Sequence, residues 1–216
     1  MVKNSKTFLG LVRIVMAVTL LYAVYWQITD RLSHNVFRPA EYFSYFTITS
    51  CILSGIVLLV AGVSAMRNLA ETKWLTIARL TIACSMVIVG VIYNLLLADQ
   101  APDPRDVGYD WPQVPNLIMH TYMPIIICLE WLWSNTTFRI KLNQALWVLI
   151  YPLAWLGFSL VRGTLQGWWP YWFINPANGL GTVLTWIGVI SAFFIVLSLI
   201  LVPLQRLSAR LYPASR

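Results

Sequence analysis

Residues 180–204 have the sequence LGTVLTWIGVISAFFIVLSLILVPL, which holds no charged side chain. A helix of about 20 apolar residues crosses the roughly 30 Å hydrocarbon core of a bilayer, so this run predicts a transmembrane helix. Its apolar residues are continuous and do not alternate with polar ones, which argues against the strands of a membrane barrel. The stretch therefore predicts a helical membrane protein.

Five further apolar runs of similar length precede this stretch. They are 8–28, 42–66, 74–98, 116–134 and 142–161. The sequence therefore predicts an all-α, polytopic membrane protein, a six-transmembrane-helix bundle that forms a single integral membrane domain over 1–216. The first run is too long for the apolar core of a cleaved signal peptide and contains Arg13, so we expect it to remain as a span.

The composition of the 216 residues agrees with this class of protein. Hydrophobic residues make up 59% and charged residues 11%, against about 45–50% and about 25% in soluble domains. The formal net charge is +7, but the basic side chains stand at the ends of the runs, so no nucleic-acid partner is expected. Cys51, Cys84 and Cys128 all lie inside apolar runs, and neither a disulfide framework, a metal site nor a cofactor is expected.

The distribution of basic residues predicts the orientation in the membrane. Lys3 and Lys6 precede the first run, and the second loop, the fourth loop and the C-terminal tail also carry Lys and Arg. Because cytoplasmic segments carry the excess of these residues, both termini are expected in the cytoplasm.

Two loops on the opposite, outer side have distinctive compositions. The third loop, 99–115, holds four Asp and four Pro and is expected to be an extended acidic surface segment. The fifth loop holds Trp168, Trp169, Tyr171 and Trp172 and is expected to form an aromatic belt at the membrane interface.

Few ionisable side chains lie within the predicted spans. Arg13, Arg79 and Glu130 stand near the cytoplasmic ends of their runs. Because an isolated charge in lipid is costly, an ion pair between Glu130 and one arginine is expected, with a proton or substrate pathway as the alternative. His120 differs, because it stands near the outer end of its run and has no acidic neighbour in the sequence.

A stripe of small polar residues lies near the same depth as His120. It consists of Ser44, Thr47, Cys51 and Ser54, which recur at helical spacing. Thr47 and His120 could therefore meet across the bundle, where a neutral imidazole would take the proton of the threonine hydroxyl and make it a nucleophile. Small hydroxyl residues also serve helix–helix packing in membranes, so both interpretations stay open.

The stretch 116–130, NLIMHTYMPIIICLE, resembles a segment of a known family. Met119, His120, Thr121, Pro124 and Glu130 match its M-H-T-x-x-x-P pattern with a following Glu. The family is that of the androgen-induced protein and the androgen-dependent TFPI-regulating protein, which are multi-span threonine hydrolases of fatty acid esters of hydroxy fatty acids. The stretch 42–50, YFSYFTITS, resembles the segment that holds the family's nucleophile.

The stretch 151–176, YPLAWLGFSLVRGTLQGWWPYWFINP, resembles the bacterial branch of the same family, with Trp169 where we expect Tyr. The matching residues are Arg162, Gly163, Gly167, Trp168, Pro170, Tyr171, Phe173 and Pro176. The resemblance covers roughly residues 8–200 and implies a bacterial-type member in the cell membrane. It implies Thr47 as the nucleophile and His120 as its base, with Thr49 and Thr121 as the nearest alternatives.

The preferred hypothesis is a membrane-embedded hydrolase of lipid esters, with the substrate taken from the bilayer. Thr47 would attack the ester carbonyl, and His120 would act first as base and then as acid. Arg162 stands at the outer border, where it is expected to bind a lipid carboxylate or, alternatively, to snorkel to the interface. Four further residues are candidates for substrate binding, the last three of them for stabilising an oxyanion: Ser44, Tyr93, Asn94 and Asn116.

Two other functions stay open. One is a small-molecule or lipid transporter or binding protein that uses the same polar cavity without hydrolysis. The other is a structural or assembly subunit whose Trp-rich outer loop meets a partner. Contact between Thr47 and His120 beside a lipid-accessible cavity would favour the hydrolase.

Overall fold

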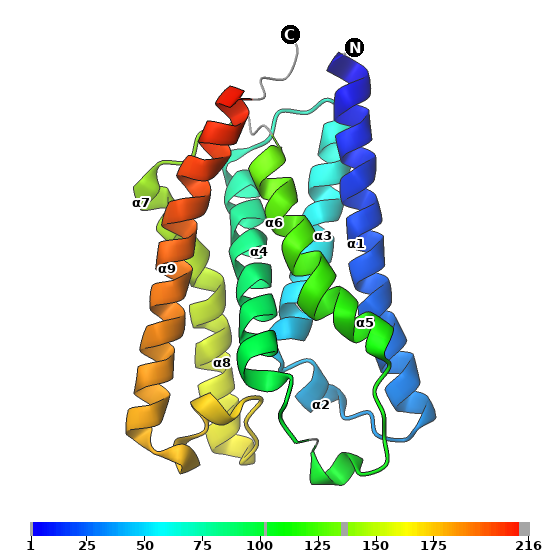
Figure 1. The fold of residues 1–216 in the computed structure, drawn as a ribbon, viewed down its shortest axis with the longest axis vertical. Helices are drawn as coiled ribbons and strands as arrows, with labels where there is room; N and C mark the ends of the chain where they lie inside the picture. The colour runs from blue at the N-terminus through cyan, green and yellow to red at the C-terminus, as the bar shows by residue number, and fades with distance from the viewer. Residues whose placement is uncertain (1, 102, 135–137, 212–216) are drawn as a thin grey trace.

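The computed structural model describes residues 2–101, 103–134 and 138–211 (Figure 1). Within these ranges the regular elements are all helical, which confirms the all-α part of the predicted fold class. Five of the described helices are long and apolar enough to cross a membrane. They are Lys6–Ser33, Phe46–Met66, Lys73–Leu97, Leu142–Gln166 and Leu180–Ser208.

The elements differ widely in length. The long helices are α1 (Val2–Ser33), α3 (Phe46–Met66), α4 (Lys73–Ile92), α8 (Ile150–Gln166) and α9 (Leu180–Leu211). The short helices are α2 (Pro39–Tyr42), α5 (Gln113–Leu117), α6 (Met123–Trp133) and α7 (Leu142–Ala145). Two segments are π-helical, η1 (Tyr93–Leu97) and η3 (Ile118–Tyr122). Four more are 3₁₀-helical: η2 (Pro104–Asp106), η4 (Leu146–Leu149), η5 (Trp172–Ile174) and η6 (Pro176–Asn178).

The predicted span at 116–134 is not among the five apolar helices. Here α5, η3 and α6 follow one another from Gln113 to Trp133, and α6 alone has 11 residues. Polar residues such as His120 and Glu130 lower the hydropathy of this stretch, and Pro124 offers no backbone N–H to the helix. A sixth crossing at this place therefore stays a prediction.

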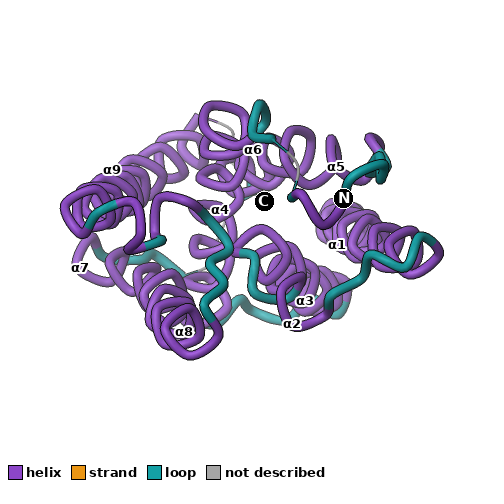
Figure 2. The backbone as a smooth tube through the Cα atoms, turned by 90° about the horizontal axis from the view of Figure 1, so that it is seen from below, coloured by secondary structure: helices purple, strands orange, loops and turns teal. Residues whose placement is uncertain are grey.

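The long helices run side by side, and the start of α1 and the end of α9, nearest the two termini, lie at one end of the bundle (Figure 1). The other end carries α2 and the loops 99–112 and 167–179. Viewed along the bundle, α4 lies in the middle (Figure 2), where it packs against α3, α6 and α9. This place explains why most of the α4 side chains are buried.

Glycines allow the closest helix packing, between α1 and α3. A methyl group added at Gly10 would lie 2.7 Å from the Gly62 carbonyl oxygen, and one added at Gly62 would lie 2.8 Å from the Gly10 oxygen. Gly55 leaves room in the same way for the side chain of Leu21. In lipid there is no hydrophobic driving force for helices to associate, so van der Waals contact at this close approach stabilises the pair.

At the end that holds the termini, an ion-pair network joins α1, α4 and α6. Glu130 Oε1 lies 2.8 Å from Arg13 Nε and 2.7 Å from Arg79 Nη2. Arg79 Nη1 also lies 2.9 Å from Oε1 of Glu71. The predicted ion pair is confirmed, and Glu130 binds both arginines rather than one.

At the opposite end, the loop 99–112 is anchored rather than extended. Arg38 Nη2 lies 2.7 Å from Asp106 Oδ1, and Arg105 Nη2 lies 2.9 Å from Glu41 Oε2 on α2. Tyr109 donates a 2.6 Å hydrogen bond to Asp30 at the end of α1. The expected extended acidic segment is therefore an anchored loop in which Asp103 and Asp106 are paired with arginines.

Candidate functional site

The sequence-predicted site residues all lie toward the end of the bundle opposite the termini, but they fall into three separate places. Thr47 lines an apolar pocket. Ser44 and Arg162 line a groove on the surface. The other four residues form a polar cluster around the two π-helical segments: Tyr93, Asn94, Asn116 and His120.

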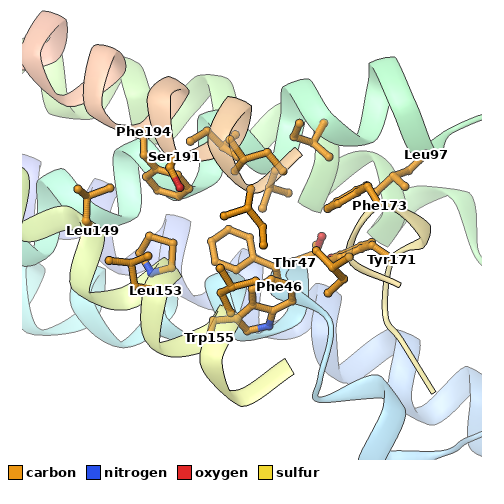
Figure 3. A pocket seen from close by; sticks show the side chains of 18 residues that line it. Phe46, Thr47, Leu97, Leu149, Leu153, Trp155, Tyr171, Phe173, Ser191 and Phe194 are labelled. Atoms are coloured by element: carbon orange, nitrogen blue, oxygen red, sulfur yellow. The ribbon is translucent and has the colours of Figure 1, made fainter. Parts of the chain in front are cut away.

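The pocket lies between α3, α4, α8 and α9 and has a volume of about 80 Å³ (Figure 3). Its walls are mainly aliphatic and aromatic, with Phe46, Trp155 and Phe194 in edge-to-face contact. The hydroxyls of Thr47, Ser191 and Tyr171 are the polar groups of its lining side chains, apart from the indole N–H of Trp155. That N–H donates a 3.0 Å hydrogen bond to the Ser44 carbonyl oxygen. The pocket is thus apolar, with few hydrogen-bonding groups.

Thr47 is the second residue of α3, where backbone N–H groups have no partner within the helix. Tyr171 reaches this helix end from the loop after α8 (Figure 3). Its phenol lies within hydrogen-bonding range of the Thr47 side chain and of the backbone of Phe46 and Thr47. Burial raises the pKa of Tyr171, and these polar contacts oppose the rise. The phenol is therefore neutral and can hold a ligand oxygen or the Thr47 hydroxyl by hydrogen bonding, but it cannot serve as a base.

The loop that carries Tyr171 is turned inward by two glycines. Gly167 ends α8 in the left-handed region, with φ 68°. Gly163 allows Trp169 to lie against α8, because a methyl group at Gly163 would come 2.5 Å from the indole ring. As a result Phe173 and Ile174 are buried and line the pocket with Tyr171. The expected interfacial aromatic belt is therefore in part a wall of the pocket.

The polar cluster joins η1 to η3. The Tyr93 and His120 rings are stacked, with centroids 3.6 Å apart and 19° between their planes. Asn116 Nδ2 donates a 2.7 Å hydrogen bond to the Tyr93 hydroxyl. Asn94 Nδ2 donates to the carbonyl oxygens of Gly90, at 2.8 Å, and of His120, at 3.1 Å. π-Helical segments occur frequently at functional sites, and here two of them lie together.

The hydrogen bond of His120 defines its tautomer. Nδ1 lies 3.0 Å from the Asn116 carbonyl oxygen. Because a carbonyl oxygen only accepts, Nδ1 carries the proton and Nε2 keeps its lone pair. Nε2 has no hydrogen-bond partner among the described residues. The imidazole thus has the tautomer that a general base requires.

Thr47 and His120 are not hydrogen-bonded to each other in the part of the chain that the structure describes. Thr47 opens on the pocket together with Ile88 and Ile92 of α4. His120 instead packs near Gly90 and Asn94, and at about 100° per residue those positions lie on the opposite face of α4. Ile88 and Ile92 therefore face the pocket from one side of α4, whereas the polar cluster packs on another side, and η3 also contacts α3 directly.

Of the two alternative threonines, Thr49 has a hydroxyl that is already engaged. It accepts a 2.9 Å hydrogen bond from Tyr151, whose hydroxyl also lies 3.0 Å from Ser50 Oγ. Thr121 is half-buried in η3. Neither residue lines the pocket. Thr47 is thus the threonine that an apolar ligand in the pocket would meet.

Sequence reasoning missed Trp155 and Tyr171 as residues of the site. The resemblance to the bacterial branch includes Tyr171, which was the one signal for that residue, and Trp155 is not among its matching residues. Their inward direction depends on how the loop folds back on α8, which no residue spacing expresses.

No three His, Cys, Asp or Glu side chains among the described residues gather in a way that could hold a metal ion. Searches of protein-family models, curated proteins and solved structures found no match to this chain. The resemblance to the threonine hydrolases therefore stays a prediction that rests on the residues quoted above.

Proposed function

We propose that this protein binds the hydrocarbon chain of a membrane lipid in the pocket between α3, α4, α8 and α9. The observation that carries the proposal is an apolar pocket between these helices with the Thr47 hydroxyl on its wall. All four helices belong to segments apolar enough to lie in a bilayer. Lipid chains would surround such helices and could enter the pocket from the bilayer.

The packing of α8 supports entry of such a ligand. Among the described elements, α8 has close backbone packing mainly with η4, which directly precedes it. The space between α8 and its neighbours is bridged by side chains, among them Phe46 and Trp155. Side chains can change rotamer more easily than backbones can separate, so a chain from the bilayer can enter beside α8.

The polar groups of the pocket define what the ligand must offer. Lipid tails are as apolar as the pocket walls, so a bare hydrocarbon gains little by moving from the bilayer into the protein. The Thr47 and Tyr171 hydroxyls favour a chain that carries one hydrogen-bonding group, such as an ester carbonyl. This requirement selects a functionalised acyl chain over an ordinary membrane tail.

Filling the pocket tests the binding proposal. The probe is a fatty acid ester of a hydroxy fatty acid with a diazirine in its chain, cross-linked by light to the protein in vesicles. Ile190→Trp, which fills the pocket, should reduce cross-linking to background. Val189→Trp is the matched control, because Val189 is the neighbouring residue and is 51% exposed on the outside of α9. Equal cross-linking of Ile190→Trp and the native chain would exclude the pocket.

A second candidate function is hydrolysis of the bound ester, which the family resemblance implies. Thr47 Oγ would bond to the ester carbonyl carbon while its proton passes to His120 Nε2. The alcohol would then leave with that proton, and water would release the acid from the acyl-enzyme. The tautomer of His120 favours this role, but the reaction needs the two side chains to come within hydrogen-bonding distance. Catalytic contacts often tighten only when substrate is bound.

Labelling with a fluorophosphonate tests the hydrolase proposal separately. We expect the probe on Thr47 in the native protein and none on Thr47→Val, with ester turnover reduced at least about 100-fold. Thr49→Val is the control, because the Thr49 hydroxyl is held by Tyr151. This variant should still be labelled on Thr47. Turnover by Thr47→Val at the native rate would refute the role of Thr47 as nucleophile. Cross-linking of the native protein without any ester turnover would leave lipid binding as the function.

We also propose six membrane crossings with both termini in the cytoplasm of a bacterial cell. An even number of crossings agrees with the start of α1 and the end of α9 lying at one end of the bundle (Figure 1). The helical stretch from Gln113 to Trp133 would supply the sixth crossing. Its charged residue, Glu130, is paired inside the bundle and so does not face lipid.

A further inference from the structure

Arg162 lies in a surface groove that is distinct from the Thr47 pocket. The groove has a volume of about 760 Å³ and runs between α2 and the last three turns of α8. Pro39, Ala40 and Phe43 line one side, and Phe158 and Val161 line the other. The hydrogen bond from Trp155 to the Ser44 carbonyl lies between the groove and the pocket, so the two can be occupied independently.

The guanidinium of Arg162 is held in place but not neutralised. Its Cζ lies 4.8 Å from the centroid of the Trp168 ring, which orients the guanidinium plane. Its Nη1 is buried and has no hydrogen-bond partner among the described residues. A buried donor without an acceptor costs free energy, so the site is incomplete without an acceptor from outside the protein.

The other arginines at this end of the bundle are all paired. Arg31 and Arg38 bind Asp106, and Arg105 binds Glu41 and Asp103. By contrast, no carboxylate of the described residues pairs with Arg162. The missing acceptor is therefore an anion, because the charge of this guanidinium is not compensated within the described chain.

The surroundings of Arg162 indicate that the anion belongs to a lipid. Phe158, Val161 and Leu165 of the same helix face are 51%, 61% and 80% exposed. Such apolar side chains at the end of a membrane helix lie against lipid. Arg162 itself stands about 7.5 Å along α8 from Gly167, at 1.5 Å per residue. From the last turns of a membrane helix, a long basic side chain reaches the interface, where phosphate groups of lipids lie.

We propose that this groove is a binding site for one anionic phospholipid. The lipid phosphate accepts hydrogen bonds from the Arg162 guanidinium, and the lipid chains lie along Phe158, Val161 and Leu165. The planar fork of arginine suits two oxygens of one phosphate. The site does not depend on the ligand proposed for the Thr47 pocket, so either proposal can fail alone.

Native mass spectrometry of the purified full chain tests the site by titration with phosphatidylglycerol and with phosphatidylcholine. We expect one phosphatidylglycerol to bind more tightly than phosphatidylcholine. Arg162→Gln should weaken the affinity for phosphatidylglycerol about tenfold, because a charge-assisted contact is lost. Arg67→Gln removes the same charge from an exposed arginine at the other end of the bundle and should leave this binding unchanged. Equal binding to Arg162→Gln and the native chain overturns the proposal.

Two further measurements distinguish a bound lipid from a soluble anion. Inorganic phosphate should not compete with phosphatidylglycerol at equal concentration, and competition by it would mean a site for a soluble anion instead. A phosphatidylglycerol with a diazirine in its chain should cross-link the native protein at Phe43, Phe158 or Val161. Cross-links confined to other helices overturn the proposal without any variant, even if Arg162→Gln fails to fold.

Discussion

Glu130 receives two guanidinium groups on one carboxylate oxygen, Oε1. The side chains of Arg13, Arg79 and Glu130 are 4%, 1% and 6% exposed, so the charges are almost completely removed from water and lipid. Each charge is tolerable there because another compensates it. The residue therefore stabilises three helices at once.

At this scale we predict that Glu130→Gln destabilises the bundle strongly. The amide leaves Arg13 and Arg79 buried with less compensating charge, and breaking a buried pair costs about 3–5 kcal/mol. Thermal unfolding in detergent measures the change. Asp99→Asn removes an exposed carboxylate and should change stability by less than about 0.5 kcal/mol. Similar midpoints for the two variants would contradict this role of Glu130.

The sequence predicted the partner of Glu130 because two arginines and one glutamate near the same membrane depth have few other ways to be neutralised. It could not predict the contacts of Thr47 in the same way. A hydroxyl can be satisfied by many neighbours, including the backbone of its own helix, so its depth does not select a partner. Whether Thr47 faces His120 or Tyr171 depends on the rotation of α3 and on the loop after α8.

At the scale of elements, the contact of α1 with α3 depends on two glycines. Gly10 and Gly62 each lie where a methyl group would meet the carbonyl oxygen of the other. The apolar runs predicted both helices, but every helix in such a bundle is apolar. Which two approach this closely is decided by the shape of their facing surfaces, not by hydrophobicity.

We predict that Gly62→Leu separates α1 from α3. The added side chain would meet Ile14 and the Arg13 side chain as well as the Gly10 oxygen, and such overpacking costs about 1–3 kcal/mol or more. Gly188→Leu is the control, because a methyl group at Gly188 meets nothing within 4 Å. The unfolding midpoint in detergent should fall for Gly62→Leu alone. An unchanged midpoint for Gly62→Leu would show that α1 can move away from α3 without loss of stability.

In the segment from Gln113 to Trp133, residues of the candidate site make a transmembrane span difficult to recognise from hydropathy. Its polar residues lower the hydropathy that marks a span, yet the same residues build the cluster of Tyr93, Asn116 and His120. A π-helical turn in each of the two neighbouring segments brings these side chains together. No pattern in the sequence marked either turn, because π-helical turns depend on tertiary contacts such as the hydrogen bond from Asn94 to the His120 carbonyl.

At the scale of the whole molecule, the crossing of this segment can be tested by labelling. Asp110 and Arg139 are both exposed and lie on either side of 113–133. In a variant without the native cysteines, Asp110→Cys should react with a membrane-impermeant maleimide in intact cells. Arg139→Cys should react only after the cells are opened. Reaction of both from the same side would rule out the sixth crossing.

The opposite end of the molecule should respond to acid. Hydrogen bonds from Arg105 lower the pKa of Asp103 to about 2, below the usual value of about 3.9. A carboxyl with a lowered folded-state pKa stabilises the fold above its unfolded-state pKa and loses this effect as the pH falls through the folded-state value. The loop 99–112 should therefore loosen as the pH drops from about 4 to about 2.

Pepsin cleavage of the loop across this pH range measures the effect. Asp103→Asn should leave the loop open to cleavage already near pH 4, because the asparagine amide cannot pair with Arg105 as a charge. Asp110→Asn, an exposed position in the same loop, should keep the native profile. Identical profiles for Asp103→Asn and the native chain would mean that other ion pairs hold the loop.

The sequence by itself determined that this chain forms helices apolar enough for a membrane, and it predicted an ion pair between Glu130 and an arginine. Both follow from the cost of placing polar groups in hydrocarbon, which depends on composition and depth alone. Only the tertiary structure decided that Thr47 faces an apolar pocket with Tyr171, that His120 stacks on Tyr93, and that Arg162 is unpaired among the described residues. Those outcomes depend on helix rotation and loop packing, where many arrangements bury the same apolar surface and the close fit of side chains selects one.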